Sequence, residues 1–329
     1  MSAQAFSSVP PDDSAIARVV SRLSSEYALR AFQLLIELYG DVRSGLIAQT
    51  IHAANTAHVD ARTEEGRAIA DPDGTLANEV RRPISVARIG ESVGIPFEST
   101  RRIVQRLVDN GTCRRTPRGV IMPAAMVERP ETIRAVNANV GFVRKFVRDL
   151  EALGLAESYG LAMATEGNDI VFARAVARLS GDYLLRILRL LAEAYGDIRR
   201  AIVAQTILMA NTAHLDARGA IGLRYCGIHE APPDAQRRPI SVARLAESLG
   251  VAYETMRGQT RRLAAAGFCV LTEGGLIVPA AVEESPALVR AMLANVVYVR
   301  RLLSDLQTME RTLTPNEGSV HAGLSRVWG

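Results

Sequence analysis

The chain contains two copies of one sequence unit, because most of residues 16–153 recurs 156 positions later. Residues 48–62 read AQTIHAANTAHVDAR and residues 204–218 read AQTILMANTAHLDAR, so 12 of these 15 positions are identical. Farther along, RRPISVAR occurs at residues 81–88 and again, unchanged, at residues 237–244. Copies that stay in register over this length predict two copies of one fold and argue against a stack of short repeats.

The repeat sets the expected domain organisation. A chain of 329 residues divides into two units of roughly 150 residues, each long enough to bury its own core. We expect a disordered tail at residues 1–13, a first unit at 14–154, a second unit at 155–311 and a second disordered tail at 312–329. Apolar residues make up 48% of the chain and aromatic residues only 5%, which is typical of a globular protein without an aromatic-lined sugar or base-stacking surface.

Charge and cysteine usage limit the setting in which the chain works. The net charge is +4, and arginine supplies every basic side chain except Lys145. The first residues, MSAQAFSSVPPDDS, have neither the basic start nor the apolar centre of a signal peptide, and no apolar run has the roughly 18 residues of a membrane span. The three cysteines, Cys113, Cys226 and Cys269, cannot form a symmetric set of disulfides. We therefore expect a cytoplasmic protein without membrane contact.

The first part of each unit is expected to be helical. In the first copy, the helical spacing of apolar residues is interrupted at residues 24–26, where Ser25 can cap a new helix. A second helix is expected over residues 41–62. Residues 63–80 and their counterparts 219–236 differ most between the copies, which is typical of a loop.

Residues 83–122 follow the layout of a winged helix-turn-helix. The pattern predicts a two-turn helix over residues 86–93 that ends at Gly94, a tight turn, and a second helix over residues 98–109. Residues 112–122 alternate around a Thr-Pro-Arg-Gly turn, which predicts two short strands. The expected fold class is mainly α with small β-hairpin wings, as two tandem winged helix-turn-helix units from an internal duplication.

The helix over residues 98–109 divides into an apolar and a polar face at about 100° per residue. Its inner face consists of Thr100, Ile103, Val104, Leu107 and Val108. Its outer face consists of Ser99, Arg101, Arg102, Gln105 and Arg106. Arginine can pair with guanine edges, glutamine with adenine, and serine with phosphate near the positive end of a helix. This face therefore predicts a recognition helix for the DNA major groove.

Arginines of the hairpin extend the predicted DNA surface, and they differ between the copies. The first hairpin carries Arg114, Arg115 and Arg118, and residues 81–125 hold nine arginines against three acidic residues, a balance of +6. In the second copy the predicted recognition helix spans residues 254–265, and its DNA-contacting candidates are Thr255, Arg257, Arg261 and Arg262. There Gly258 replaces Arg102, and the hairpin arginines become Val270, Leu271 and Gly274, so that the balance falls to +3. The first copy is therefore expected to be the principal reader of DNA.

Residues 84–122, ISVARIGESVGIPFESTRRIVQRLVDNGTCRRTPRGVIM, resemble the winged helix-turn-helix regulators of bacteria, especially the IclR and MarR-like groups. The resemblance covers about 45 residues in each copy and implies DNA binding and transcription regulation. The chain departs from IclR regulators because no large α/β effector domain follows the wing. Helices on both sides of the winged unit are more similar to the dimerising helices of MarR-type proteins, although these usually occur as one unit per chain.

The last helix of each unit carries a heptad-like seam. Over residues 131–153 the apolar side chains are spaced three and four apart from Ile133 to Leu150, and residues 287–309 repeat this spacing. Such a seam predicts pairing with another helix, in a homodimer or in an intrachain pseudo-dimer. Packing on the core of its own unit fits the pattern equally well.

Other constellations of polar residues do not indicate a catalytic or metal site. His58 and Asp60 lie two positions apart, as do His214 and Asp216, so each pair points to different faces of a helix and does not predict a shared metal. Asn55 and its counterpart in the second copy are polar positions in an apolar helix, for which we expect buried hydrogen bonds between helices. Phosphate-binding, zinc-protease and nucleophile-elbow motifs are absent from the sequence, so we expect no enzyme, no cofactor and no metal.

The sequence thus predicts a sequence-specific DNA-binding transcription regulator, bound to double-stranded DNA at the bacterial nucleoid. Two alternatives remain open. Winged units also serve as protein-interaction scaffolds, and tandem winged units are similar to plasmid replication initiators, which bind direct repeats at an origin. The DNA site, the direction of regulation and any small-molecule effector are left undetermined.

Overall fold

The structure, a computed structural model, describes residues 13–59, 74–155, 161, 169–215 and 222–313. It is mainly helical, with two small antiparallel hairpins, as the sequence predicts. The first half consists of α1 (Asp13–Tyr39), α2 (Val42–Thr56), α4 (Val86–Val93), α5 (Phe97–Asp109), β1 (Arg114–Thr116), β2 (Gly119–Ile121), α6 (Ala124–Val127) and α7 (Pro130–Glu151). The second half consists of α8 (Ile170–Tyr195), α9 (Ile198–Thr212), the 3-10 turns η2 (Gly222–Tyr225) and η3 (Asp234–Gln236), α10 (Val242–Ser248), α11 (Tyr253–Ala265), β3 (Val270–Thr272), β4 (Gly275–Ile277), α12 (Ala280–Glu283) and α13 (Pro286–Leu313).

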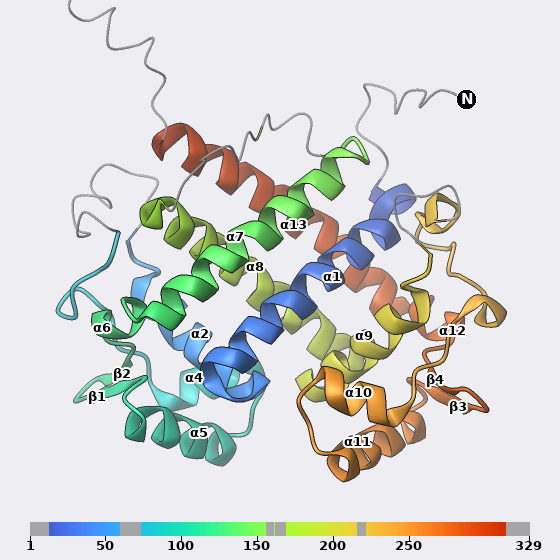
Figure 1. The fold of residues 1–329 in the computed structure, drawn as a ribbon, viewed down its shortest axis with the longest axis horizontal. Helices are drawn as coiled ribbons and strands as arrows, with labels where there is room; N and C mark the ends of the chain where they lie inside the picture. The colour runs from blue at the N-terminus through green and yellow to red at the C-terminus, as the bar shows by residue number, and fades with distance from the viewer. Residues whose placement is uncertain (1–12, 60–73, 156–160, 162–168, 216–221, 314–329) are drawn as a thin grey trace, which may run out of the picture.

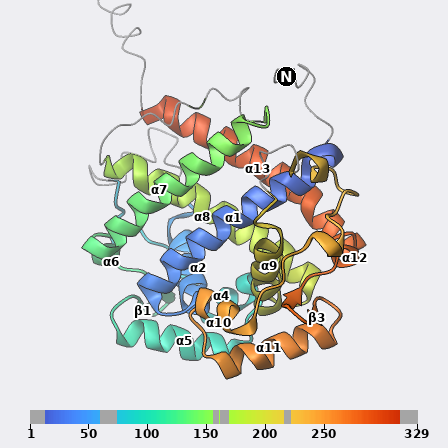
Figure 2. The same cartoon turned by 45° about the vertical axis from the view of Figure 1, so that its right-hand side comes forward.

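Four long helices form the centre of the molecule. Helix α1 packs on α7 and α13, and α8 packs on the same two helices, so each long helix of one half contacts the other half. Helices α2 and α9 lie beneath this layer and carry α4–α5 and α10–α11 on one side of the molecule (Figure 1). The view in Figure 2 keeps the same order of layers.

Polar contacts cross between the halves inside this helical layer. The Tyr27 hydroxyl donates to Asn139 Oδ1 at 3.2 Å, and Asn139 Nδ2 donates to Ser180 Oγ at 2.9 Å. Their counterparts in the other half repeat the pattern: the Tyr183 hydroxyl contacts Ser24 Oγ at 2.7 Å and donates to Asn295 Oδ1 at 3.0 Å. All six side chains are buried. The two halves therefore share one core.

The hairpin of the first half is held against a short extended segment. Val120 exchanges two backbone hydrogen bonds with Ile84, at 2.9 and 3.1 Å. They form an antiparallel β-bridge, which places the segment at Ile84 beside β2. Gly119 has φ +142°, and a Cβ at this position would lie 2.5 Å from the Ile84 carbonyl oxygen. Only glycine allows this close backbone approach.

Two sequence-based boundaries are wrong. Helix α1 runs from Asp13 to Tyr39 without the predicted interruption at residues 24–26, because Ser24 Oγ donates to the Val20 carbonyl at 2.7 Å and Ser25 Oγ donates to Gln205 at 3.0 Å. These serines therefore have partners without capping a helix. Helix α2 spans Val42–Thr56 and is shorter than the predicted 41–62. Asp41 is its N-cap and accepts from the Ser44 amide at 3.0 Å, and the helix ends in a turn in which the Val59 amide donates to the Thr56 carbonyl at 3.0 Å. Residues 60–62 lie outside the described residues.

The two heptad-like seams are buried within the chain. Helix α7 packs chiefly on α1 and α8, and α13 packs chiefly on α8 and α1. Val143 and Leu150 in the first seam and Leu303 and Leu306 in the second are completely buried. Each seam thus contacts both its own half and the other half. Both predicted tails fall largely outside the described residues, although Asp13 and residues 312–313 belong to helices.

Asn55 joins α2 to the hairpin. Its amide nitrogen donates to the carbonyls of Arg82 at 2.7 Å and Val120 at 3.2 Å, and its oxygen accepts from the Met122 amide at 2.8 Å. The predicted buried hydrogen bonding is confirmed, but the expectation that it links helices is wrong, because the partners are backbone groups on and around β2. Asn211 makes the same three bonds in the second half.

Replacing Asn55 with alanine is expected to lower the free energy of unfolding by about 2 kcal/mol, because buried backbone groups of the hairpin lose their partner. Urea unfolding followed by circular dichroism measures the change. Asn137→Ala, at a half-buried position of α7, is the control and should cost no more than about 0.5 kcal/mol. Equal losses for the two variants would contradict a special role of Asn55.

Candidate nucleic-acid interface

Short-range signals in the sequence determine where α4 and α5 lie. Ser85 caps α4 by accepting from the Arg88 amide at 3.3 Å, and Gly94 ends the helix in the left-handed region with φ +64°. The predicted helix and its glycine stop are thus confirmed. Helix α5 buries its predicted inner face, with Val104 completely and Leu107 almost completely removed from solvent. The position of the polar face follows from this packing.

The predicted outer face of α5 is exposed. Arg101, Arg102, Gln105 and Arg106 are exposed, and Ser99 is half-buried. The hairpin side chains Arg114, Arg115 and Arg118 are also exposed. We call the six exposed arginines of α5 and of this hairpin the arginine surface: Arg101, Arg102, Arg106, Arg114, Arg115 and Arg118.

The helix and the hairpin of the first half form one continuous surface. Arg115 Nη2 donates to Gln105 Oε1 at 3.0 Å, which ties β1 to the outer face of α5. Gln105 Nε2 in turn donates to Asp109 at 2.7 Å. Among the residues that the structure describes, Arg102, Arg114 and Arg118 pair with no carboxylate.

Two arginines of this surface already have carboxylate partners. Arg101 contacts Glu98 Oε2 at 3.1 Å, and Arg106 contacts Asp41 Oδ2 at 3.0 Å and Ser44 Oγ at 2.7 Å. Both ion pairs are solvent-exposed, and such pairs contribute only about 0–1 kcal/mol. Arg101 can therefore leave Glu98 at little energetic cost. Arg106 joins α5 to the N-cap of α2, so it also helps to position α5.

The second half presents a weaker version of this surface. Thr255, Arg257, Arg261 and Arg262 are all exposed, as predicted, and Arg257 contacts Glu254 at 3.0 Å. Its hairpin differs in character, because Leu271 is 74% exposed at the position of Arg115.

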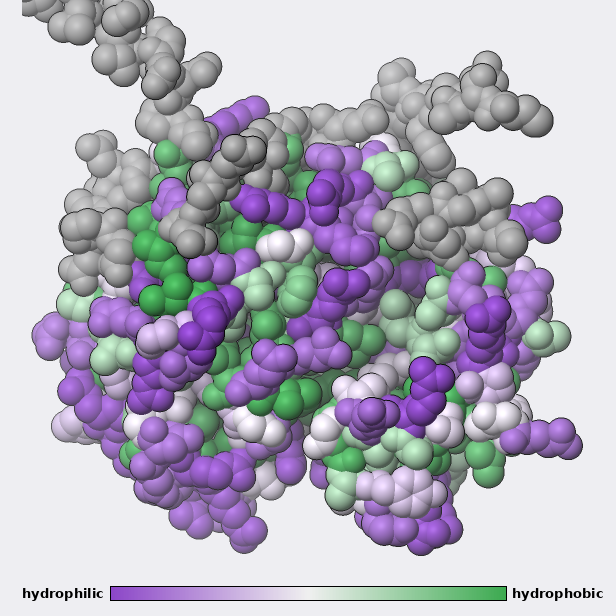
Figure 3. Space-filling model, in the orientation of Figure 1, coloured by the Kyte–Doolittle hydropathy of each residue, from purple (hydrophilic) through white to green (hydrophobic). Residues whose placement is uncertain are grey.

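The two candidate surfaces lie on the same side of the molecule. Helices α5 and α11 run along its lower edge in Figure 1, with β1–β2 at one flank and β3–β4 at the other. In Figure 3 the corresponding lower regions are coloured as hydrophilic, most continuously over the first half. Both helices can therefore face one extended partner.

Two exposed aromatic residues were missed by sequence reasoning. Phe97 is 52% exposed and Tyr253 is 50% exposed, and each is the first residue of its helix. The sequence prediction placed Phe97 in the turn before α5. The alignment of the two copies carries a usable signal, because both have an aromatic residue at this position, next to the polar face.

Comparisons with known proteins found no match. No protein-family model, no curated protein and no solved structure matches the chain. Among the described residues, no helix is long and apolar enough to span a membrane, and no group of three or more histidine, cysteine, aspartate or glutamate side chains could hold a metal ion. Asp60 and Asp216 of the two His–Asp pairs lie outside the described residues.

Proposed function

We propose that the chain is a sequence-specific DNA-binding transcription regulator, built of two tandem winged helix-turn-helix units that arose by internal duplication. The observation that carries this proposal is the placement of α5 and α11 along one side of the molecule, each with an exposed arginine-bearing face and a hairpin beside it. A helix with such a face fits the major groove of B-DNA, and a flanking hairpin then lies over the phosphate backbone.

In the proposed complex, the outer face of α5 enters the major groove. Arg101 and Arg102 reach base edges, where arginine can form two parallel hydrogen bonds with guanine. Arg114 and Arg118 contact phosphates, which set the position of the protein on the duplex without reading sequence. Arg106 keeps α5 oriented through Asp41.

The affinity for DNA is expected to depend steeply on salt. If about six to nine phosphates are contacted, the logarithm of the association constant should fall with the logarithm of salt concentration at a slope of roughly −5 to −8. Fluorescence anisotropy of a labelled duplex, titrated at several salt concentrations, measures this slope. Replacing Arg114 and Arg118 together with alanine should make the slope shallower by about 2.

The matched control is Arg301→Ala on α13, which lies away from the edge that carries α5 (Figure 1). It should leave the slope unchanged. A slope near zero for the unaltered protein would contradict DNA binding.

A protein-interaction scaffold is the second candidate, and the exposed apolar hairpin of the second half favours it. Val270 and Leu271 are 42% and 74% exposed, respectively, where the first half has arginines. Exposed apolar side chains of this kind often contact a protein partner. This alternative predicts no salt-dependent DNA binding, so the same titration separates the two functions.

A further inference from the structure

Each half contains a cavity between its own helices and those of the other half, at equivalent positions. The first cavity lies among α1, α2, α7 and α8 and has a volume of about 440 Å³; Tyr27, His52, Arg81, Asn139 and Ser180 are among the residues that line it. The second cavity is lined by the counterparts of many of these residues but has a volume of only about 60 Å³. A cavity of several hundred Å³ is typical of a small-molecule site.

Larger side chains fill the second cavity. Ile187 replaces Ala31, Leu288 replaces Thr132, and Ser25 occupies the position of Gly181. These changes add side-chain volume at positions that line both cavities. The difference in size is therefore encoded in the sequence of the two copies.

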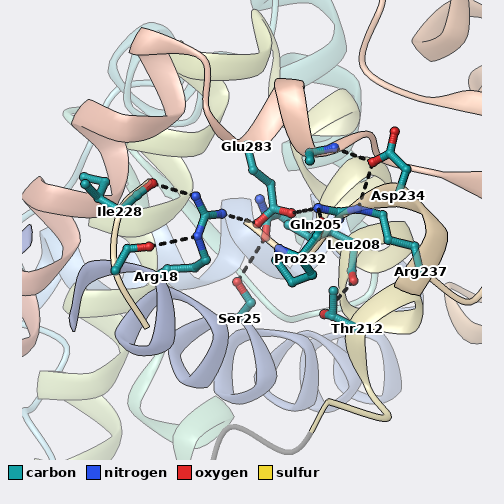
Figure 4. Close-up of polar contacts among 12 residues, drawn as sticks. Arg18, Ser25, Gln205, Leu208, Thr212, Ile228, Pro232, Asp234, Arg237 and Glu283 are labelled. Carbon is teal, nitrogen blue, oxygen red and sulfur yellow. Dashed lines mark hydrogen bonds and ion pairs between the residues drawn. The ribbon is translucent and has the colours of Figure 1, made fainter. Parts of the chain in front are cut away.

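A buried carboxylate also lies at the second cavity. Glu283, on α12, is nearly buried and accepts from Arg18 Nη1 and from Arg237 Nη2, each at 2.6 Å (Figure 4). Asp234 lies 3.3 Å from Arg237 Nε. The side chains of Arg18 and Arg237 are 1% and 0% exposed, so two buried guanidinium groups share one buried carboxylate.

The lining of the first cavity keeps both arginines, one from each half, but has neither carboxylate. Arg174 and Arg81 are the counterparts of Arg18 and Arg237, whereas Val127 replaces Glu283 and Asn78 replaces Asp234. No aspartate or glutamate is among the described residues that line the first cavity.

Within the part of the chain that the structure describes, Arg81 is consequently a buried cation without a paired anion. It is 4% exposed, its Nε donates to the Leu76 carbonyl at 3.0 Å, and its Nη1 has no hydrogen-bond partner. The acidic side chain that acts on it electrostatically, Glu128, is exposed and forms no ion pair with it within the described structure. A buried charge of this kind is costly unless an anion compensates it.

His52 also faces the first cavity, and its Nδ1 is buried without a partner. Burial, together with the charges of Arg81, Arg178 and Arg174, lowers the pKa of His52 to about 4. His52 is therefore neutral near pH 7, and the cavity combines a positive electrostatic field with an apolar wall that includes Leu34, Leu35 and Leu184.

We propose that the first cavity binds a small amphipathic monocarboxylate, with its carboxylate on Arg81, at the place that Glu283 occupies in the second half, and its apolar body against the wall of the cavity. Arginine binds a carboxylate through two parallel hydrogen bonds. In the second half, Glu283 already supplies this carboxylate. We therefore expect one ligand to bind per protein molecule. The inference does not depend on DNA binding, and its test is a separate measurement.

Isothermal titration calorimetry of the full chain with decanoate and with 2-naphthoate tests the proposal. We expect at least one of these probes to bind with one site per chain, and the matching neutral compound, decan-1-ol or 2-naphthamide, to bind much more weakly. Arg81→Ala should weaken binding by roughly 10- to 150-fold, the usual effect of losing a hydrogen bond to a charged group. Arg82→Ala, at the exposed neighbouring position, is the matched control and should leave binding unchanged.

Val127→Glu provides a second variant that does not remove the buried arginine. It gives the first half the carboxylate that the second half already has, so it should abolish binding of the probe without lowering the melting temperature. Failure of both carboxylates to bind, equally tight binding of the neutral compounds, or unchanged binding to Val127→Glu would each overturn the proposal.

Discussion

Replacing Glu283 with alanine is expected to lower the free energy of unfolding by about 3–5 kcal/mol, the usual cost of removing one partner from a buried ion pair. Each arginine would lose a contact at 2.6 Å and stay buried, and Arg237 would keep only one carboxylate partner, the half-exposed Asp234 at 3.3 Å. The cost arises from this loss of compensation more than from the lost attraction, because a buried guanidinium group is costly when no anion neutralises it. Urea unfolding measures the change.

The neighbouring residue provides the control for this prediction. Glu284 is exposed, and Glu284→Ala should change stability by no more than about 0.5 kcal/mol. Glu283→Gln keeps the size and one acceptor but not the charge, so its loss should be intermediate. Added acetate should raise the melting temperature of Glu283→Ala more than chloride at the same ionic strength does, because it can enter the space between the two arginines. Equal unfolding midpoints for Glu283→Ala and Glu284→Ala would show that the buried pair does not stabilise the fold.

Replacing Arg102 with alanine is expected to weaken binding to the preferred DNA site by roughly 5- to 150-fold, since a base-edge contact of arginine is worth about 1–3 kcal/mol. Arg102 is exposed in the middle of the outer face of α5, and its counterpart is Gly258. Arg262→Ala should cost less, because the second half has fewer arginines beside it. The binding of both variants is measured on one duplex, selected from a random pool, at one salt concentration.

Introducing an arginine into the second half also tests whether the first half contributes more to DNA binding. A Cβ at Gly258 would meet no atom within 4 Å, so Gly258→Arg introduces no clash at its first side-chain atom. It should tighten DNA binding, and it should also stabilise α11, because glycine within a helix costs about 1 kcal/mol relative to alanine. Equal losses for Arg102→Ala and Arg262→Ala would indicate two equivalent readers, and a larger loss for Arg262→Ala would reverse the ranking.

The parts of the fold that depend on local signals could be predicted from the sequence. Ser85 and Gly94 bound α4, and the apolar spacing of Ile103, Val104 and Leu107 orients α5, because caps and helical periodicity act over a few residues. The continuity of α1 could not be predicted, since Ser25 finds its partner Gln205 180 positions away. Its hydroxyl group looks like a cap in the sequence and is a contact between helices in the fold.

The candidate sites, too, could be predicted from the sequence only where local signals determine them. The exposed arginines followed from periodicity, whereas the contact between Arg106 and Asp41 joins residues 65 positions apart and leaves no local trace. The first cavity depends on side chains from several helices of both halves, so no single segment indicates it. A comparison of the two copies does contain the signal, because Val127 and Glu283 are equivalent positions of opposite polarity.

The buried contacts of Tyr27, Asn139 and Ser180 across the two halves have a consequence for the proposed DNA recognition. A regulator assembled from two identical subunits must read the same half-site twice, because every mutation appears in both. Here one covalent chain holds α5 and α11 at a fixed separation, and each half has been free to change by itself, as Arg102 and Gly258 already show. The preferred DNA site is therefore expected to lack two-fold symmetry, and its occupancy should follow the first power of protein concentration even at dilutions where a dimer would dissociate.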